Sequence, residues 1–265
     1  MHNTTYHKAS SAAEAASLLS GAEDGALLAG GQTLIPTMTQ RLAAPTDLID
    51  ISGVGEMQGI CVDGSTVTIG AMTTHAEVAS SAELRAICPS LADLASHIGD
   101  PAVRHRGTLG GSVANNDPAA DYPAAMLALG ATIKTDKREI AADDFFQGMF
   151  TTALNEGELI VSVSFDAPSK GAYAKFPNPA SRYAMCGVYV AQGADGVRVA
   201  VTGAGDDGVF RSSDMEAALA SDFSAGALDG VSVSADGMLS DIHGDAAYRA
   251  NLVKVMAKRA VAAAK

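Results

Sequence analysis

The chain has 265 residues, of which 48% are hydrophobic and 18% charged, so it can bury a sizeable core and is not disordered. Its formal net charge of −12 excludes a general binder of nucleic acids or anionic membranes, because either would need a basic face. The cysteines Cys61, Cys88 and Cys186 form no CxxC pair. We therefore expect no metal or iron–sulfur site in this chain, and a reducing compartment.

The acidic excess is unevenly distributed along the chain. Residues 1–166 hold 20 acidic and 8 basic residues, whereas residues 167–265 hold 10 of each. This shift, with the turn-rich stretch 166–171, predicts one domain over 1–166, with subdomains of about 1–55 and 56–166, and a second over 167–265. No apolar run approaches the roughly 18 residues of a membrane-spanning helix, and the N-terminus lacks the apolar core of a secretory signal.

The first part of the chain has the pattern of a small parallel α/β unit. Residues 11–19 are rich in alanine and have helical spacing. Residues 26–29 form a short apolar run that stops at Gly30-Gly31, residues 33–42 have a helical pattern, and residues 48–51 form a second apolar run. This order of strand, helix and strand predicts a small parallel sheet.

The pattern then changes to hairpins and helices. Residues 59–71 alternate around Asp63-Gly64, which predicts a β-hairpin. Residues 74–97 are expected to form two helices separated at Pro89. Further on we expect a helix ending near Leu129, strands at 131–135 and 159–165, strands after residue 170 that include 185–191 and 197–201, and helices at 214–220 and 245–263.

Two glycine segments are candidates for binding an anion. They are Ala29-Gly30-Gly31-Gln32-Thr33, between a predicted strand and a predicted helix, and Thr108-Leu109-Gly110-Gly111-Ser112. A Gly-Gly step permits positive φ and lets backbone N–H groups converge, and a helix beginning at Thr33 would add the positive end of its dipole. Neither segment matches the GxGxxG or Walker A pattern, so a plain tight turn is the simpler interpretation of each segment taken alone.

The residues around these segments resemble the FAD-binding medium subunit of the molybdenum hydroxylases, a family that includes aerobic carbon monoxide dehydrogenase and the flavin domain of xanthine dehydrogenase. The resemblance extends from near residue 10 to near residue 260. The stretches that carry it are 29–36, 98–123, 144–146, 157–160, 173–176, 180–184 and 241–249. It implies an α+β, two-subdomain FAD-binding fold, with a small parallel α/β subdomain and a larger mixed or antiparallel sheet subdomain. A C-terminal antiparallel three-stranded sheet with a helical bundle follows.

The resemblance also implies which residues hold the cofactor. In the family the two glycine segments bind the FAD pyrophosphate through backbone amides. An aspartate after the second segment, here Asp121 with Asp117 as a second candidate, contacts the hydroxyl-rich part of the flavin. The residues implied by these contacts are Ala29, Gly30, Gly31, Gln32, Thr33, Leu34, Ile35, Thr108, Leu109, Gly110, Gly111, Ser112, Asp117 and Asp121.

Other single residues have both a cofactor-binding interpretation and a plainer one. Asp121 is equally suited to capping the helix that follows it. Lys175 matches a family lysine that would stabilise the anionic reduced flavin, or it is a surface lysine on a strand. Ile160 matches a position that lines the adenine, or it belongs to the strand core. Ile98 matches a position that touches the cofactor, and Tyr183 is a hypothesis for stacking on the flavin.

The function implied by the resemblance is electron transfer inside a larger complex. A large subunit would carry the molybdenum cofactor, and a small subunit would carry two [2Fe–2S] clusters. This chain would pass electrons from the clusters through FAD to an external acceptor, with no side chain as a catalytic acid or base. A dimer of heterotrimers in the cytoplasm or at the inner face of the membrane is implied. Arg104 and Arg106 would hold a loop or meet a partner subunit. The alternatives are a stand-alone FAD-dependent oxidase and an assembly or binding protein without cofactor.

Overall fold

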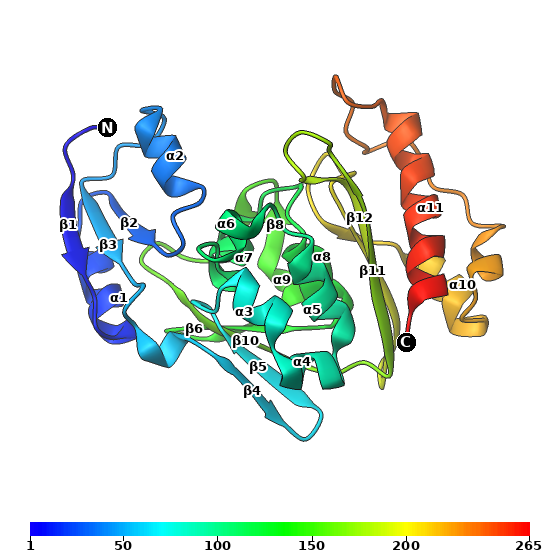
Figure 1. Cartoon of the computed structure of the whole chain (residues 1–265). Coiled ribbons are helices and arrows are strands. Elements are labelled where there is room, and N and C mark those ends of the chain that lie inside the picture. The colour runs from blue at the N-terminus through cyan, green and yellow to red at the C-terminus, as the bar shows by residue number, and fades with distance from the viewer.

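A computed structural model describes residues 1–265 and contains three main sheets that follow one another across the molecule (Figure 1). The parallel sheet at the N-terminus lies at one end, the middle sheet and its helices lie in the centre, and the C-terminal sheet with its helices lies at the other end. The predicted α+β class is confirmed, with one small parallel sheet and two larger antiparallel sheets.

The first sheet is parallel, as the sequence predicts. Its order is β1-β3-β2, and the strands are β1 (Thr5–Lys8), β2 (Gly25–Leu28) and β3 (Asp47–Asp50). Helix α1 (Ala12–Gly21) begins at Ser11, whose hydroxyl accepts from the Glu14 N–H. Helix α2 (Leu34–Thr39) is shorter than the predicted 33–42, because the chain turns at Arg41, which has a φ of 62°.

The middle sheet is antiparallel in the order β4-β5-β10-β6-β7. Its strands are β4 (Ile60–Asp63), β5 (Thr66–Gly70), β6 (Thr132–Thr135), β7 (Glu139–Ala141) and β10 (Ile160–Asp166). The predicted hairpin at Asp63-Gly64 is therefore confirmed, with β4 and β5 as its arms. The 3-10 helix η1 (Gly55–Met57) precedes it, and the hairpin of β8 (Phe146–Gly148) and β9 (Thr151–Thr152) lies apart from the sheet.

Three helices, not the predicted two, occupy the segment 74–97. Ser81 ends the first of them and caps the second through its hydroxyl, which accepts from the Leu84 N–H. Pro89 begins the third, as its fixed φ favours. The helices of this part of the chain are α3 (His75–Ser80), α4 (Ala82–Ile87), α5 (Pro89–Ser96), α6 (Pro101–Arg104), α7 (Leu109–Asn115), α8 (Tyr122–Ala128) and α9 (Ala142–Phe145).

The third sheet contains the predicted three antiparallel strands, which are β11 (Lys170–Pro177), β12 (Ala184–Gly193) and β13 (Gly196–Thr202). A fourth strand, β14 (Phe210–Arg211), has only two residues and pairs with β13. The helices of this part are α10 (Ser213–Ser221), η2 (Ala225–Leu228) and α11 (Ala246–Ala263). None of the helices combines the length and the apolar composition needed to cross a bilayer.

The third sheet is covered on both faces. Val188, Val190 and Val199 pack into a core with residues of α10 and α11, such as Met215 and Met256. On the other face, Tyr173, Tyr189, Ala191 and Ala200 belong to the large core of residues 9–165. Strand β12 lies in the middle of this layer, which explains its nearly continuous apolar sequence.

Candidate cofactor-binding site

The two glycine segments lie in direct contact. A side-chain Cβ at Gly30 would overlap the carbonyl oxygen of Arg106 and lie 2.8 Å from the Gly107 Cα, so only glycine permits this approach. A Cβ at Gly111 would lie 3.7 Å from the Ala29 Cβ. Gly31 has a φ of +70°, which turns the chain out of β2. Two segments almost eighty residues apart thus form one wall.

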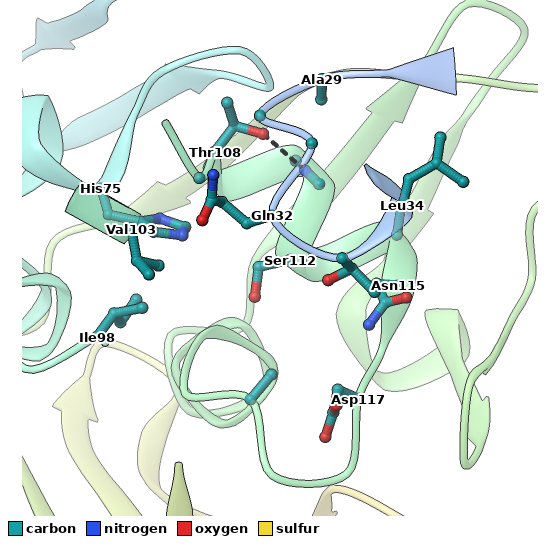
Figure 2. A pocket seen from close by; sticks show the side chains of 18 of the residues that line it. Ala29, Gln32, Leu34, His75, Ile98, Val103, Thr108, Ser112, Asn115 and Asp117 are labelled. Carbon is teal, nitrogen blue, oxygen red and sulfur yellow. Dashed lines mark hydrogen bonds between the residues drawn. The ribbon is translucent and has the colours of Figure 1, made fainter. Parts of the chain in front are cut away.

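A cavity of about 660 Å³ opens between these segments, within the size range of ligand sites in proteins. The end of β2, the beginning of α2 and the end of β3 line one end of it, where Leu27, Leu34 and Ile51 supply apolar surface. Helix α7 projects Ser112 and Asn115 into the middle, as Figure 2 shows. The other end is lined by Ile98, Gly99 and Val103, by Asp117 and Asp121, and by the loop residues 181–183.

The first glycine segment has an unusual supply of free hydrogen-bond donors. The backbone N–H groups of Ala29, Gly30, Gly31, Gln32 and Thr33 have no hydrogen-bond acceptor within the protein. Consecutive N–H groups without internal acceptors are the donors with which proteins bind phosphate. Helix α2 adds little to this, because it has only six residues and Thr33 makes no side-chain cap.

The second glycine segment differs, because four of its five N–H groups, those of residues 109–112, are already used. Leu109 and Gly110 donate to the carbonyl oxygens of Thr73 and Ala71 at 3.0 and 2.8 Å. Gly111 donates to the Thr108 hydroxyl at 3.1 Å, which is the N-cap of α7, and the Ser112 N–H donates to the Thr108 carbonyl. The Ser112 hydroxyl makes no such bond within the protein, so this segment offers the cavity a hydroxyl and a surface without side-chain bulk.

Asp121 does not cap α8, so the plainer interpretation of this residue is wrong. Its carboxylate accepts from the Tyr173 hydroxyl and, at 2.9 Å, from the Lys175 ammonium. Lys175 also donates to the His97 carbonyl at 3.1 Å. Burial raises the pKa of Asp121, and the Lys175 charge and the two hydrogen bonds oppose that shift. The side chain of Lys175 is only 6% exposed, so it is not a surface lysine.

Asp117 and Tyr183 stand on the cavity side of this buried group. Asp117 accepts from the Ala119 N–H at 2.8 Å, and partial burial raises the pKa of its carboxyl. Burial and the charges of Asp117 and Asp121 raise the pKa of Tyr183, which remains protonated at neutral pH. Tyr183 lines the cavity, and 47% of this residue is exposed.

Most of the cofactor-binding residues predicted from the sequence line this single cavity. They are Ala29, Gly30, Gly31, Gln32, Thr33, Leu34, Thr108, Gly110, Gly111, Ser112, Asp117, Asp121 and Ile160, together with Ile98 and Tyr183. Three others do not line it. Leu109 is buried in the core, Ile35 packs beside Gly31, and Lys175 lies behind Asp121.

Sequence reasoning missed several residues of the cavity wall. One of them is the buried His75 at the beginning of α3, whose backbone N–H donates to the Gly107 carbonyl at 2.9 Å. Nothing in the sequence near Thr74 or Glu77, which form an ordinary capping box, indicates that this helix begins at the cavity. Arg104 holds the loop as one of its two interpretations suggests, by donating to the Ile98 and Gly99 carbonyls at 3.0 and 3.2 Å.

A concave site that joins unpaired backbone N–H groups, glycine contacts and buried carboxylates defines a domain that binds a nucleotide cofactor. A family model described as "FAD binding domain in molybdopterin dehydrogenase" matches residues 2–168. The chain belongs to this family and is an FAD-binding subunit of the molybdenum hydroxylase type.

Individual relatives match almost the whole chain. It is 36% identical to the carbon monoxide dehydrogenase medium chain of Hydrogenophaga pseudoflava, across 98% of this chain and 96% of the relative. It is 35% identical to the nicotine 6-hydroxylase medium subunit of Paenarthrobacter nicotinovorans, across 97% and 95%. A chain of reconstituted CO dehydrogenase from Oligotropha carboxidovorans superimposes with a TM-score of 0.90 at 33% identity, across 98% and 96%.

Proposed function

We propose that this chain holds FAD in the cavity and relays electrons from the two [2Fe–2S] clusters of a small subunit, through the flavin, to an external acceptor. The observation that carries the proposal is the row of five unpaired N–H groups at Ala29–Thr33, in a segment that contacts the second glycine segment and lines the cavity. The FAD would supply the redox chemistry, because it accepts electrons singly and releases them in pairs. The protein supplies binding and orientation.

The two glycine segments have different roles in this proposal. The first donates N–H groups to the pyrophosphate. The second offers the Ser112 hydroxyl and, at Gly111, a surface without a side chain beside Ala29, whereas Gly110 packs closely against Ala71. This local arrangement has to overcome a protein charge of −12, which repels an anionic dinucleotide at long range.

The ends of the cavity suit the two ring systems. The apolar end at Leu27, Leu34 and Ile51 is suited to a flat adenine, and Ile160, which also lines the cavity, matches the family position that contacts it. The opposite end has Asp117 and Asp121, whose carboxylates can accept from ribityl hydroxyls, and the Tyr183 ring is placed to cover the flavin. In this arrangement Lys175 acts through Asp121, which it holds in place, and does not touch the cofactor directly.

The proposed partners are a large subunit with the molybdenum cofactor and the small iron–sulfur subunit, in a dimer of heterotrimers. Names such as "medium chain" for the relatives support this assembly. We place the assembly in the cytoplasm, which the three unpaired cysteines support.

The test is cofactor binding by the purified full-length chain. We expect one FAD per chain, with flavin absorption that is released on denaturation. Replacing Gly111 with Leu places a side chain between the two segments, so we expect FAD binding to weaken at least about 100-fold, as measured by titration followed by fluorescence.

Gly230→Leu is the matched control, because a Cβ at Gly230 meets nothing within 4 Å and this residue does not line the cavity. It should bind FAD like the unaltered chain. A wild-type chain that never binds FAD, alone or in its assembled complex, would overturn the proposal, and unchanged binding by Gly111→Leu would overturn the role of the second segment.

A further inference from the structure

His75 is a buried residue of the cavity wall with unused hydrogen-bonding capacity. It is 5% exposed, its Nδ1 is enclosed without a hydrogen-bond partner, and its Nε2, which is not enclosed in this way, also makes no hydrogen bond within the protein. The other buried ionisable residue of the wall, Asp121, already has two hydrogen-bond partners within the chain, Tyr173 and Lys175. Because Nδ1 is enclosed, Nε2 is the ring nitrogen that is left for a partner outside the chain.

The imidazole of His75 is neutral at physiological pH. Burial lowers its pKa to about 4, and the nearby positive charge of Arg104 acts in the same direction. Its other close neighbour is the uncharged ring of Tyr122, at 5.3 Å between centroids and tilted by 44°. The ring therefore carries one N–H donor and one acceptor nitrogen.

The surroundings of the two nitrogens indicate which one carries the proton. Nδ1 is completely enclosed and has no partner. Nε2 lies on the edge of the ring that faces Gly107, where a Cβ would come within 2.6 Å of it. Because an enclosed N–H without an acceptor is less tolerable than an enclosed lone pair, the proton belongs on Nε2.

The ring is held in this position by the start of the second glycine segment. The His75 N–H donates to the Gly107 carbonyl at 2.9 Å, and Thr74 and Thr108 form an isolated β-bridge. The absence of a side chain at Gly107 leaves the space that the imidazole edge occupies. Figure 2 shows the ring between Val103 and Gln32, pointing toward the interior of the cavity.

We propose that His75 is a positioning and tuning residue for the cofactor, whose Nε2–H donates a hydrogen bond to a carbonyl oxygen of the bound isoalloxazine ring. This inference rests on the proposed function. The flavin is favoured over the pyrophosphate because phosphate already has the donors of Ala29–Thr33, and because the apolar walls beside His75, Ile98 and Val103, suit a flat ring. Reduction adds electron density to the flavin carbonyls, so a donor there binds the reduced form more strongly than the oxidised form.

The experiment compares His75→Leu, which loses the donor, with His75→Gln, which keeps an N–H donor of similar reach, in the full-length chain. We measure the dissociation constant of oxidised FAD and the two-electron potential of the bound flavin. For His75→Leu we expect the preference for reduced over oxidised flavin to fall about tenfold, which corresponds to a potential about 30 mV lower. His75→Gln should recover at least half of that change.

Tyr122→Phe is the matched control. The Tyr122 ring lies beside the same imidazole and its buried hydroxyl has no hydrogen-bond partner, but Tyr122 does not line the cavity. Its flavin potential should equal that of the wild type. If His75→Leu binds FAD with an unchanged potential, the inference fails while the proposed function stands. If the wild-type chain binds no FAD, the proposed function itself fails.

A second measurement needs no variant, and it covers the case in which His75→Leu does not fold. NMR of the FAD-bound chain labelled with ¹⁵N-histidine should show one imidazole that stays neutral from pH 6 to 8, with its proton on Nε2 and slow exchange of that proton. A His75 ring that titrates in this range, or that carries the proton on Nδ1, would overturn the inference.

Discussion

Asp121, Tyr173 and Lys175 form a buried hydrogen-bonded group between α8 and the third sheet, directly behind the cavity. The side chains of Asp121 and Lys175 are 5% and 6% exposed, so neither charge is solvated by bulk water. A buried ion pair adds little net stability compared with apolar residues, but the loss of one partner leaves the other charge uncompensated. The group therefore fixes the carboxylate at the cavity wall more than it stabilises the fold.

Replacing Lys175 with Met keeps most of the side-chain volume and removes the cation. We expect the free energy of unfolding of the chain without FAD to fall by about 3–5 kcal/mol, measured by urea denaturation, because Asp121 is left buried without its partner. FAD binding should weaken as well, since the carboxylate loses its support.

The double variant Lys175→Met with Asp121→Asn separates the two effects. It should recover part of the lost stability, because no unpaired charge remains, but not the FAD affinity. A single variant Lys175→Met that is as stable as the wild type would contradict the buried ion pair.

For single residues, the sequence predicts those whose role depends on the local backbone conformation. It misses those whose role depends on a contact with a residue far away in the sequence. Gly30-Gly31 and Gly110-Gly111 are recognisable through the residues next to them in the sequence, since a glycine pair alone also fits a plain turn, and both pairs line the cavity. The partner of Lys175 lies 54 residues away, so Lys175 alone gives no sign of burial. His75 is missed for the same reason, since only the folded chain brings α3 to Gly107.

Among the elements, the hairpin of β6 and β7 and the turn before β10 are joined by one carboxylate. Glu158 accepts from the Thr135 hydroxyl at 2.7 Å, from the Asn155 N–H at 2.9 Å and from the Arg138 guanidinium at 3.0 Å. Its side chain is fully buried, whereas that of Arg138 is 44% exposed. The hydrogen bonds from Arg138, Asn155 and Thr135 outweigh burial and lower the pKa of Glu158 to about 2.

This shift predicts a contribution to acid stability. The pKa of Glu158 is lower in the folded chain than its ordinary value of 4.5, so the stabilisation is complete above pH 4.5 and is lost as the pH falls toward 2. Glu158→Gln should lose about 2–3 kcal/mol at pH 7 and show a flatter decline of stability between pH 4.5 and 2. Urea denaturation at a series of pH values measures both, and a variant whose decline parallels that of the wild type would contradict this assignment.

The elements that sequence reasoning located best are long or strongly patterned. The hairpin of β4 and β5 and the helix α11 agree with their predicted positions to within a few residues. Strand β1 was not predicted, because Thr5–Lys8 has no apolar run and stays largely exposed. The separation of α3 from α4 was also missed, since Ser81 ends one helix and caps the next within a single residue.

At the scale of the whole molecule, the third sheet joins the two segments that composition divides near residue 166. Its face with Tyr173 and Tyr189 belongs to the core of the first segment, and its other face packs against α10 and α11. The Tyr189 hydroxyl hydrogen-bonds to the Ser90 hydroxyl at 2.6 Å across this contact. The shift in charge near residue 166 therefore reflects which residues lie on the surface of each segment. It does not mark a break in the hydrophobic core, which extends from the first segment into the third sheet.

We accordingly expect residues 1–166 and 167–265 to unfold together. Scanning calorimetry of the full-length chain should show one transition whose calorimetric and van't Hoff enthalpies agree. Tyr189→Phe removes the buried hydrogen bond to Ser90 and the weaker one to Cys88 across the contact, so it should lower the transition by about 2–4 °C without splitting it. Two separate transitions, or a Tyr189→Phe variant in which only one part is destabilised, would show that the segments are independent domains and that the shared core does not couple them.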